Sequence, residues 1–142
     1  EIPGFLNVCI GQEAVPVAVC SHLTETDYVA TTHRGHGHAL AKGIDLKRFM
    51  AELFGRSNGP CRGRSGSMHL ADTSRGVIGA NGIVGGGIPI AVGAAFAAKY
   101  KKTGQVTVCF FGEGATGEGT FHESLNLAEH HREYFGLGPL PD

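Results

Sequence analysis

Residues 105–128 read QVTVCFFGEGATGEGTFHESLNLA, and this stretch decides the fold. The apolar residues between positions 106 and 111 favour a buried parallel strand. That strand runs directly into a glycine-rich turn at residues 112–117 and then into a helical pattern. A strand, a glycine-rich turn and a helix N-terminus together form a phosphate-binding arrangement. We therefore expect an α/β fold with a phosphorylated ligand at this turn.

A carboxylate, Glu113, lies between the first two glycines and leaves three interpretations open. The letters G-x-G-x-x-G match the dinucleotide fingerprint, which alone is a weak signal. Two points oppose the dinucleotide interpretation. A glutamate beside the phosphates would repel them. The fingerprint also requires a second strand that ends in an acidic residue about 20 positions later, and the sequence around Glu133 contains no strand-like run. Alternatively, Glu113 binds a divalent cation that neutralises a diphosphate held by the amides of Gly114 and Ala115, as Mg²⁺ sites commonly do. In the third interpretation Glu113 is a solvated loop residue.

Composition narrows the class of protein without naming a function. A chain of 142 residues, 42% hydrophobic and 18% charged, fits one globular domain with its own core. A net charge of -1 provides no broad basic field for nucleic acid. No apolar run reaches the roughly 20 residues that span a bilayer, and no signal peptide is visible. The four cysteines show neither C-x-x-C spacing nor the density of a disulfide scaffold, which fits a reducing compartment.

Helices and strands alternate in the first half of the chain. We expect a helix over Gln12 to His22, with Pro16 in or just after its first turn. A short strand is expected at Asp27 to Thr31. Asp45 can cap a following helix that Gly55 ends. One apolar stripe of this helix is expected to be core: Leu46, Phe49, Met50, Leu53 and Phe54.

The second half of the chain is expected to open with a glycine loop and an Ala/Gly-rich helix over residues 79–104. The small residues of this helix permit close packing against another element. Strand, helix and strand in this order predict an α/β fold with a parallel sheet flanked by helices.

Three histidines, His33, His36 and His38, surround Arg34 after the first expected strand. Imidazole is a common transition-metal ligand, but no H-E-x-x-H or C-x-x-C pattern supplies further ligands. The three histidines could equally well line a polar cleft instead of binding a metal. The planar fork of Arg34 suits a phosphate.

Five separated motifs carry a family resemblance. They are GQEAV (residues 11–15), THRGHGHALAKG (32–43), GRSGSMH (63–69), GANGIVGGGIP (79–89) and FFGEGATGEGTFHESLNLA (110–128). Together, and in this order, they resemble the alpha subunit of the thiamine-diphosphate-dependent 2-oxo acid dehydrogenases, which act on pyruvate, branched-chain 2-oxo acids or acetoin. The match runs from about Gly4 to Ala128. It implies a thiamine-diphosphate-binding fold. The THRGHGH and GANGIVG motifs are most similar to those of the acetoin and pyruvate branches.

The resemblance also implies roles for individual residues. Glu113 matches the acidic Mg²⁺ ligand, which is usually aspartate in the family. Gly114 and Ala115 match the positions whose backbone meets the diphosphate. Arg34 matches the diphosphate-binding arginine, and His33 occupies the cofactor-contact position before it.

Three further residues match the other end of the cofactor. His36 matches a histidine near the reacting end, so the resemblance implies a catalytic role for it. Gly82 and Val84 match the segment that contacts the aminopyrimidine. The implied cofactors are thiamine diphosphate and Mg²⁺, and the cofactor carries the hard chemistry.

The implied reaction is oxidative decarboxylation of a 2-oxo acid such as pyruvate, or cleavage of acetoin, with acyl transfer to lipoyl groups. The resemblance implies a beta subunit in an α₂β₂ heterotetramer and a lipoyl-bearing acyltransferase core as partners. The implied compartment is the bacterial cytoplasm or the mitochondrial matrix, without nucleic acid or membrane as partner. Two alternatives are a non-catalytic, truncated cofactor-binding or subunit-interaction module and, more distantly, an NAD-binding Rossmann oxidoreductase.

The chain departs from the family pattern at both ends. The family's metal motif continues in a later strand that ends in Asn-Asn, but no asparagine follows Asn126. Asn7 stands where the family often has histidine. We therefore expect residues 1–142 to form a single, partial thiamine-diphosphate-binding domain, incomplete at both ends, with a divergent tail at residues 129–142.

Overall fold

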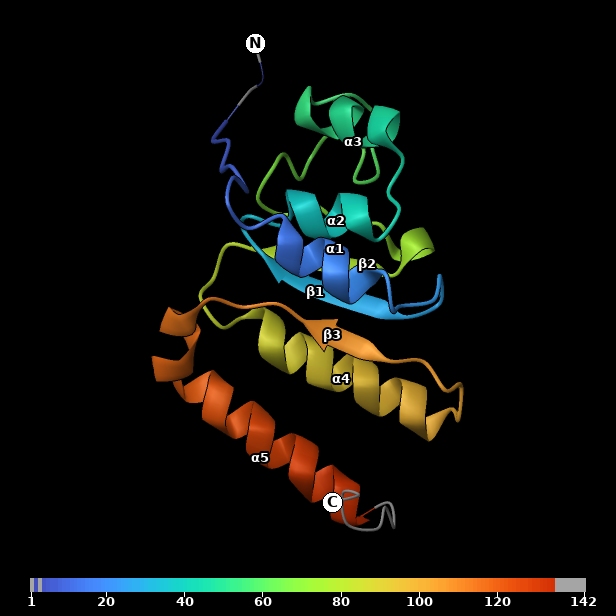
Figure 1. Ribbon diagram of the computed structural model, residues 1–142, viewed down its shortest axis with the longest axis vertical. Helices are drawn as coiled ribbons and strands as arrows, with labels where there is room; N and C mark the ends of the chain where they lie inside the picture. The colour runs from blue at the N-terminus through green and yellow to red at the C-terminus, as the bar shows by residue number, and fades with distance from the viewer. Residues whose placement is uncertain (1, 3, 135–142) are drawn as a thin grey trace.

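The computed structural model describes residue 2 and residues 4–134. Three parallel strands form a sheet in the order β2-β1-β3. β1 (Tyr28–Thr32) lies in the centre, between β2 (Val77–Asn81) and β3 (Thr107–Cys109) (Figure 1). The predicted α/β fold with a parallel sheet flanked by helices is confirmed.

Helices lie on both sides of this sheet (Figure 1). On one side α1 (Ala14–Cys20) packs against α2 (His36–Ala41), with α3 (Leu46–Leu53) beyond them. On the other side α4 (Gly87–Tyr100) packs against β1 and β3, and α5 (Gly119–Tyr134) packs against α4. Ala91 and Ala98 of α4 are buried, whereas Gly93 and Ala95 are exposed. Among the described residues, no helix is long and apolar enough to cross a membrane.

The main hydrophobic core lies between α2, α3 and β2. It consists of Ala39, Ile44, Phe49, Leu53, Leu70, Val77 and Ala80. Only part of the predicted α3 stripe belongs to it, because Leu46 (60%), Met50 (37%) and Phe54 (43%) are exposed. These three residues form the i, i+4 row beside the one that carries Phe49 and Leu53. That neighbouring row faces outward, so the predicted stripe was too wide.

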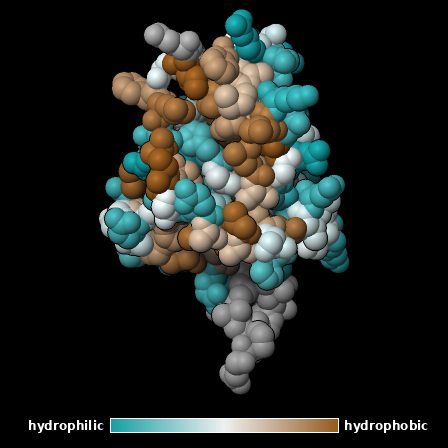
Figure 2. All heavy atoms as spheres, turned by 45° about the horizontal axis from the view of Figure 1, so that its top comes forward, coloured by the Kyte–Doolittle hydropathy of each residue, from teal (hydrophilic) through white to brown (hydrophobic). Residues whose placement is uncertain are grey.

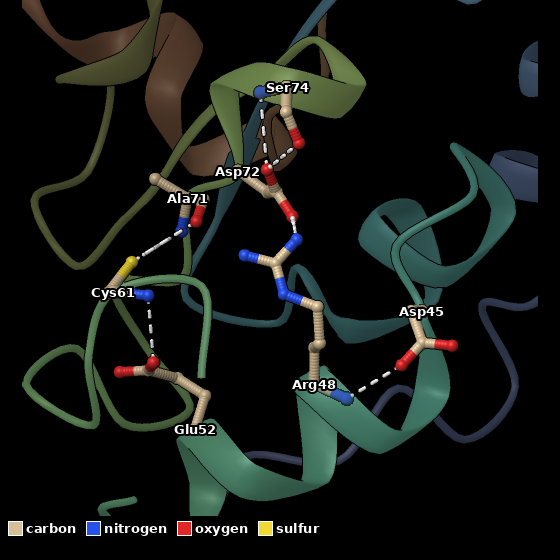
Figure 3. Close-up of polar contacts among 7 residues, drawn as sticks. All are labelled: Asp45, Arg48, Glu52, Cys61, Ala71, Asp72 and Ser74. Carbon is tan, nitrogen blue, oxygen red and sulfur yellow. Dashed lines mark hydrogen bonds and ion pairs between the residues drawn. The ribbon is translucent and has the colours of Figure 1, made fainter. Parts of the chain in front are cut away.

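Asp45 caps α3 as predicted. Its backbone is extended, and its side chain accepts a hydrogen bond from the backbone N–H of Arg48 at 2.9 Å (Figure 3). Asp45→Ala should lower the free energy of unfolding by about 1 kcal/mol, because that N–H loses its partner. Asp45→Asn keeps an acceptor and should remain close to wild type. Urea denaturation checks both variants, and equal losses for the two would contradict the capping role.

The strand β2 was not predicted, because residues 79–81 were assigned to a glycine loop. In the structure Ala30 pairs with Gly79, and Thr32 pairs with Asn81. The segment VIGAN is short, contains a glycine and shows no alternation of apolar and polar residues. Its pairing with β1 also shifts register between Val29 and Ala30. Its strand conformation comes from pairing with β1, which local sequence does not reveal.

The predicted strand and helix around the glycine-rich turn also need correction. β3 is shorter than expected and half-buried, because it lies at the edge of the described sheet. The turn does not begin the long helix. A short 3₁₀ helix, η2 (Glu113–Gly117), comes first, and α5 starts at Gly119. α5 includes residues 129–134 of the predicted tail, and residues 135–142 lie outside the described residues.

Candidate functional site

The carboxyl ends of all three parallel strands lie at one edge of the sheet. β1 ends at Thr32, β2 at Asn81 and β3 at Cys109. The chain moves from β1 to β2 on one side and then crosses to β3 on the other side of β1. The direction of winding therefore reverses between β1 and β3. Open α/β sheets bind ligands outside the strand ends at such a switch point.

A cleft of about 200 Å³ opens at this edge. It is lined by residues 31–33, 83–85 and 109–115, together with Asn81 and the first turn of α4. We call it the first cleft. All three strand ends contribute to its wall, as the topology requires.

A second cleft adjoins the first and shares part of its wall. The shared residues are Thr32, His33 and residues 110–113. Its other side is formed by Arg34, His38 and residues from the start of the chain, including Gln12. A ligand that extends along these shared residues would occupy both clefts.

The structure brings six of the predicted site residues to these clefts. His33, Val84, Glu113, Gly114 and Ala115 line the first cleft, and Arg34 lines the second with His33 and Glu113. Glu113 and Gly114 are exposed. Ala115 is buried, and its N–H donates to the carbonyl of Gly112 at 3.0 Å. In this conformation the Ala115 amide is therefore engaged within η2.

Two predicted residues lie outside the walls of both clefts. Gly82 is exposed and packs beside His69, so that a Cβ at position 82 would lie 3.0 Å from His69 Cε1. His36 begins α2, and its ring meets the edge of Phe49 with centroids 5.8 Å apart. Its Nε2 is buried and has no hydrogen-bond partner among the described residues. Burial lowers the pKa of His36.

Of the three histidines expected as a possible cleft lining, His33 and His38 line the second cleft. His38 is buried, and its ring lies 4.1 Å from that of Phe110, between centroids. Burial lowers its pKa, and the backbone of Arg34, one turn earlier, partly opposes that shift. Arg34 precedes α2, and His38 lies within it, yet both line the second cleft. Asn81 was missed because β2 was not recognised.

Arg34, which lies beside the shared wall, provides donors that fit a metal-bound diphosphate. Arg34 Nη1 donates to the carbonyl of Val8 at 2.7 Å, and its guanidinium has further N–H groups for an oxyanion. Within the described part of the chain, no three His, Cys, Asp or Glu side chains form a metal-binding group. Glu113 provides one carboxylate at the shared wall, and Mg²⁺ takes one or two carboxylates and completes its shell with phosphate oxygens and water.

Comparison with known proteins gives the family. The model of the dehydrogenase E1 component matches residues 1–133. The chain belongs to the dehydrogenase E1 component family. The resemblance inferred from the five motifs is thereby confirmed.

Relatives of this dehydrogenase E1 chain carry two kinds of name. It is 58% identical over 127 residues to the alpha subunit of acetoin:2,6-dichlorophenolindophenol oxidoreductase of Bacillus subtilis, covering 89% of this chain and 38% of that protein. The Cupriavidus necator protein of the same name is 52% identical over 128 residues, covering 90% and 38%. The pyruvate dehydrogenase E1 component subunit alpha of Zymomonas mobilis is 45% identical over 128 residues, covering 89% and 36%. The dehydrogenase E1 chain thus spans less than two fifths of these relatives.

Proposed function

We propose that this chain forms the diphosphate and Mg²⁺ part of a thiamine diphosphate site. The enzyme it serves would oxidatively decarboxylate a 2-oxo acid such as pyruvate, or cleave acetoin, with acyl transfer to lipoyl groups. One observation carries the proposal. His33 follows β1 and Glu113 follows β3, yet both line the wall that the two clefts share. Arg34 lies beside this wall, in the second cleft.

Each of these residues has a distinct task in the proposal. The Glu113 carboxylate supplies an oxygen ligand to Mg²⁺. Arg34 and the backbone of Gly114 and Ala115 bind the diphosphate, and the Ala115 N–H would first release the Gly112 carbonyl. His33 contacts the cofactor from the end of β1. When bound, thiamine diphosphate supplies the carbon nucleophile and the electron sink for bond cleavage next to the substrate carbonyl.

The aminopyrimidine end is assigned to Gly82 and Val84, of which Val84 lines the first cleft. The proposed catalytic role of His36 requires its ring to leave the edge of Phe49. The chain's own residues thus bind and orient the cofactor, and His36 is the candidate for proton movement near the reacting end.

Exposed hydrophobic side chains support a role within a larger assembly. Phe5 is 84% exposed, Ile10 80% and Ile83 72%. Figure 2 shows hydrophobic residues gathered in broad patches on one face of the molecule. Such patches mark interaction surfaces. We infer that they contact the rest of the enzyme, including a beta subunit in an α₂β₂ heterotetramer that meets a lipoyl-bearing acyltransferase core. The cytoplasm or mitochondrial matrix remains the predicted compartment.

Calorimetric titration of the alpha–beta enzyme tests this function. Thiamine diphosphate should bind with Mg²⁺ present and much more weakly after chelation, because the metal neutralises the charge between Glu113 and the phosphates. NAD⁺ should not bind. Metal-independent binding of thiamine diphosphate, or binding of NAD⁺ in its place, would contradict the proposal. Cofactor binding without any acetoin- or 2-oxo acid-dependent turnover would instead favour a non-catalytic module.

A further inference from the structure

Two aromatic contacts hold the segment between β3 and Glu113. The ring of Phe110 lies 4.1 Å from the His38 ring, between centroids, at an interplanar angle of 53°. The ring of Phe111 meets that of Phe121 at 5.6 Å and 61°. Consecutive side chains of an extended segment point to opposite faces. The first contact therefore comes from α2 and the second from α5, which lie on opposite sides of β3 (Figure 1).

The backbone of this segment is fixed just before Glu113. The N–H of Phe110 donates to the carbonyl of Ala30 at 2.9 Å, which extends the pairing of β1 and β3 by one residue. After Phe110, Phe111 and Gly112 precede Glu113. A Cβ at Gly112 would meet no atom within 4 Å, so packing at that glycine does not restrain the chain. The position of the Glu113 carboxylate therefore depends on how residues 110 and 111 are held.

His38 is itself held firmly, because α2 lies close to its neighbours. A Cβ at Gly35 would come within 2.5 Å of Thr31 Cγ2, and one at Gly37 within 2.9 Å of Cys9 Sγ. The Nδ1 of His38 is buried and has no hydrogen-bond partner among the described residues. Packing therefore contributes to holding the ring, alongside the nearby backbone of Arg34, and it maintains the contact of the ring with Phe110.

We propose that His38 and Phe121 are positioning residues for Glu113, acting through Phe110 and Phe111 from the two sides of β3. This inference rests on the proposed function, in which Glu113 is a ligand of Mg²⁺. Neither residue has to touch the metal. Loss of a residue that orients a metal ligand typically weakens metal affinity roughly 10- to 100-fold.

The test measures the Mg²⁺ concentration that half-saturates thiamine diphosphate binding in the alpha–beta enzyme, by calorimetry. His38→Ala and Phe121→Ala should each raise it roughly 10- to 100-fold. His38→Phe restores an aromatic ring that can contact Phe110 and should return this concentration to the wild-type value. The control is Phe96→Ala, which removes another aromatic pair, with Tyr100 on α4 at 6.2 Å, and should leave it unchanged.

The variants separate positioning from other roles. Wild-type values in both alanine variants would overturn the proposal, as would a His38→Phe variant as weak as His38→Ala, which would assign the effect to a ring nitrogen. If His38→Ala does not fold, the His38→Phe and Phe121→Leu variants decide by the same criteria, with Phe121→Leu expected to weaken Mg²⁺ use. Wild-type enzyme that binds the cofactor without Mg²⁺ would overturn the proposed function as well. Normal Mg²⁺ dependence with unaffected variants would overturn the positioning roles alone.

Discussion

Replacing Glu52 with alanine should lower the free energy of unfolding by about 3–6 kcal/mol, because three backbone donors lose their buried acceptor. Glu52 is fully buried. Its Oε2 accepts hydrogen bonds from the N–H groups of Cys61 (2.8 Å) and Gly63 (2.9 Å). Its Oε1 accepts from the N–H and the hydroxyl of Ser65, each at 2.8 Å. A fully buried donor left unpaired costs about 1–3 kcal/mol. Cys61, Gly63 and Ser65 are half-buried, so each of the three losses should cost about 1–2 kcal/mol.

The effect extends beyond one loop, because Glu52 connects three parts of the fold. Residues 59–65 wrap around its carboxylate, and a Cβ at Gly59 would collide with it. Cys61 Sγ in turn donates to the carbonyl of Ala71 at 3.1 Å and accepts a hydrogen bond from the Ala71 N–H at 3.3 Å (Figure 3). Ala71 precedes β2. Loss of the carboxylate should therefore loosen the connection between α3 and β2. Urea denaturation measures the change, with Glu25→Gln as the control, since the Glu25 side chain is 92% exposed.

The same carboxylate should make stability depend on pH. Burial acts to raise the pKa of Glu52, but its four hydrogen bonds outweigh that effect and hold the pKa below the ordinary value of 4.5. The pKa of Asp27 is also lowered, first by the N–H of Val106. A carboxylate whose pKa is lower in the folded state stabilises the fold above its unfolded pKa. This stability is lost as the pH falls through the folded value.

Denaturation at pH values from 7 to 3 can isolate the Glu52 part of this dependence. Glu52→Gln should be less stable than wild type at pH 7, and its stability should fall less steeply below pH 4.5. Glu25→Gln should keep the wild-type slope. An unchanged slope in Glu52→Gln would show that this carboxylate does not govern acid unfolding.

Local signals predicted much of this fold, whereas pairing between distant segments did not show in the sequence. The Asp45 cap and the strand before Gly112 depend on neighbours in sequence. β2 depends on β1, some 50 residues earlier, so Asn81 was missed at the edge where it lies. Within α2, His36 and His38 are two residues apart and point in different directions. Which of them faces the cleft became clear only from their partners, Phe49 and Phe110.

Glu113→Ala should weaken Mg²⁺-supported binding of thiamine diphosphate by roughly 100-fold or more, exceeding the loss typical for a residue that only supports a ligand. Glu113 contributes a carboxylate to the wall that the first and second clefts share. Glu113→Asp keeps the carboxylate with one methylene fewer and should retain most of the metal dependence. Glu123→Ala is the matched control, because Glu123 is exposed on α5 and lies outside both clefts. Calorimetric titration with and without Mg²⁺ measures all three.

The sign of the Glu113→Ala effect distinguishes the three interpretations of the turn. If Glu113 faced phosphates directly, as a dinucleotide fingerprint would require, removing its charge would relieve repulsion and strengthen diphosphate binding. If Glu113 were a solvated loop residue, binding would not change. Only a metal ligand predicts weaker binding in Mg²⁺ together with no further loss after chelation, because without the metal the carboxylate has nothing to coordinate. A tighter or unchanged complex in Glu113→Ala would therefore remove the chemical basis for placing Mg²⁺ at this turn.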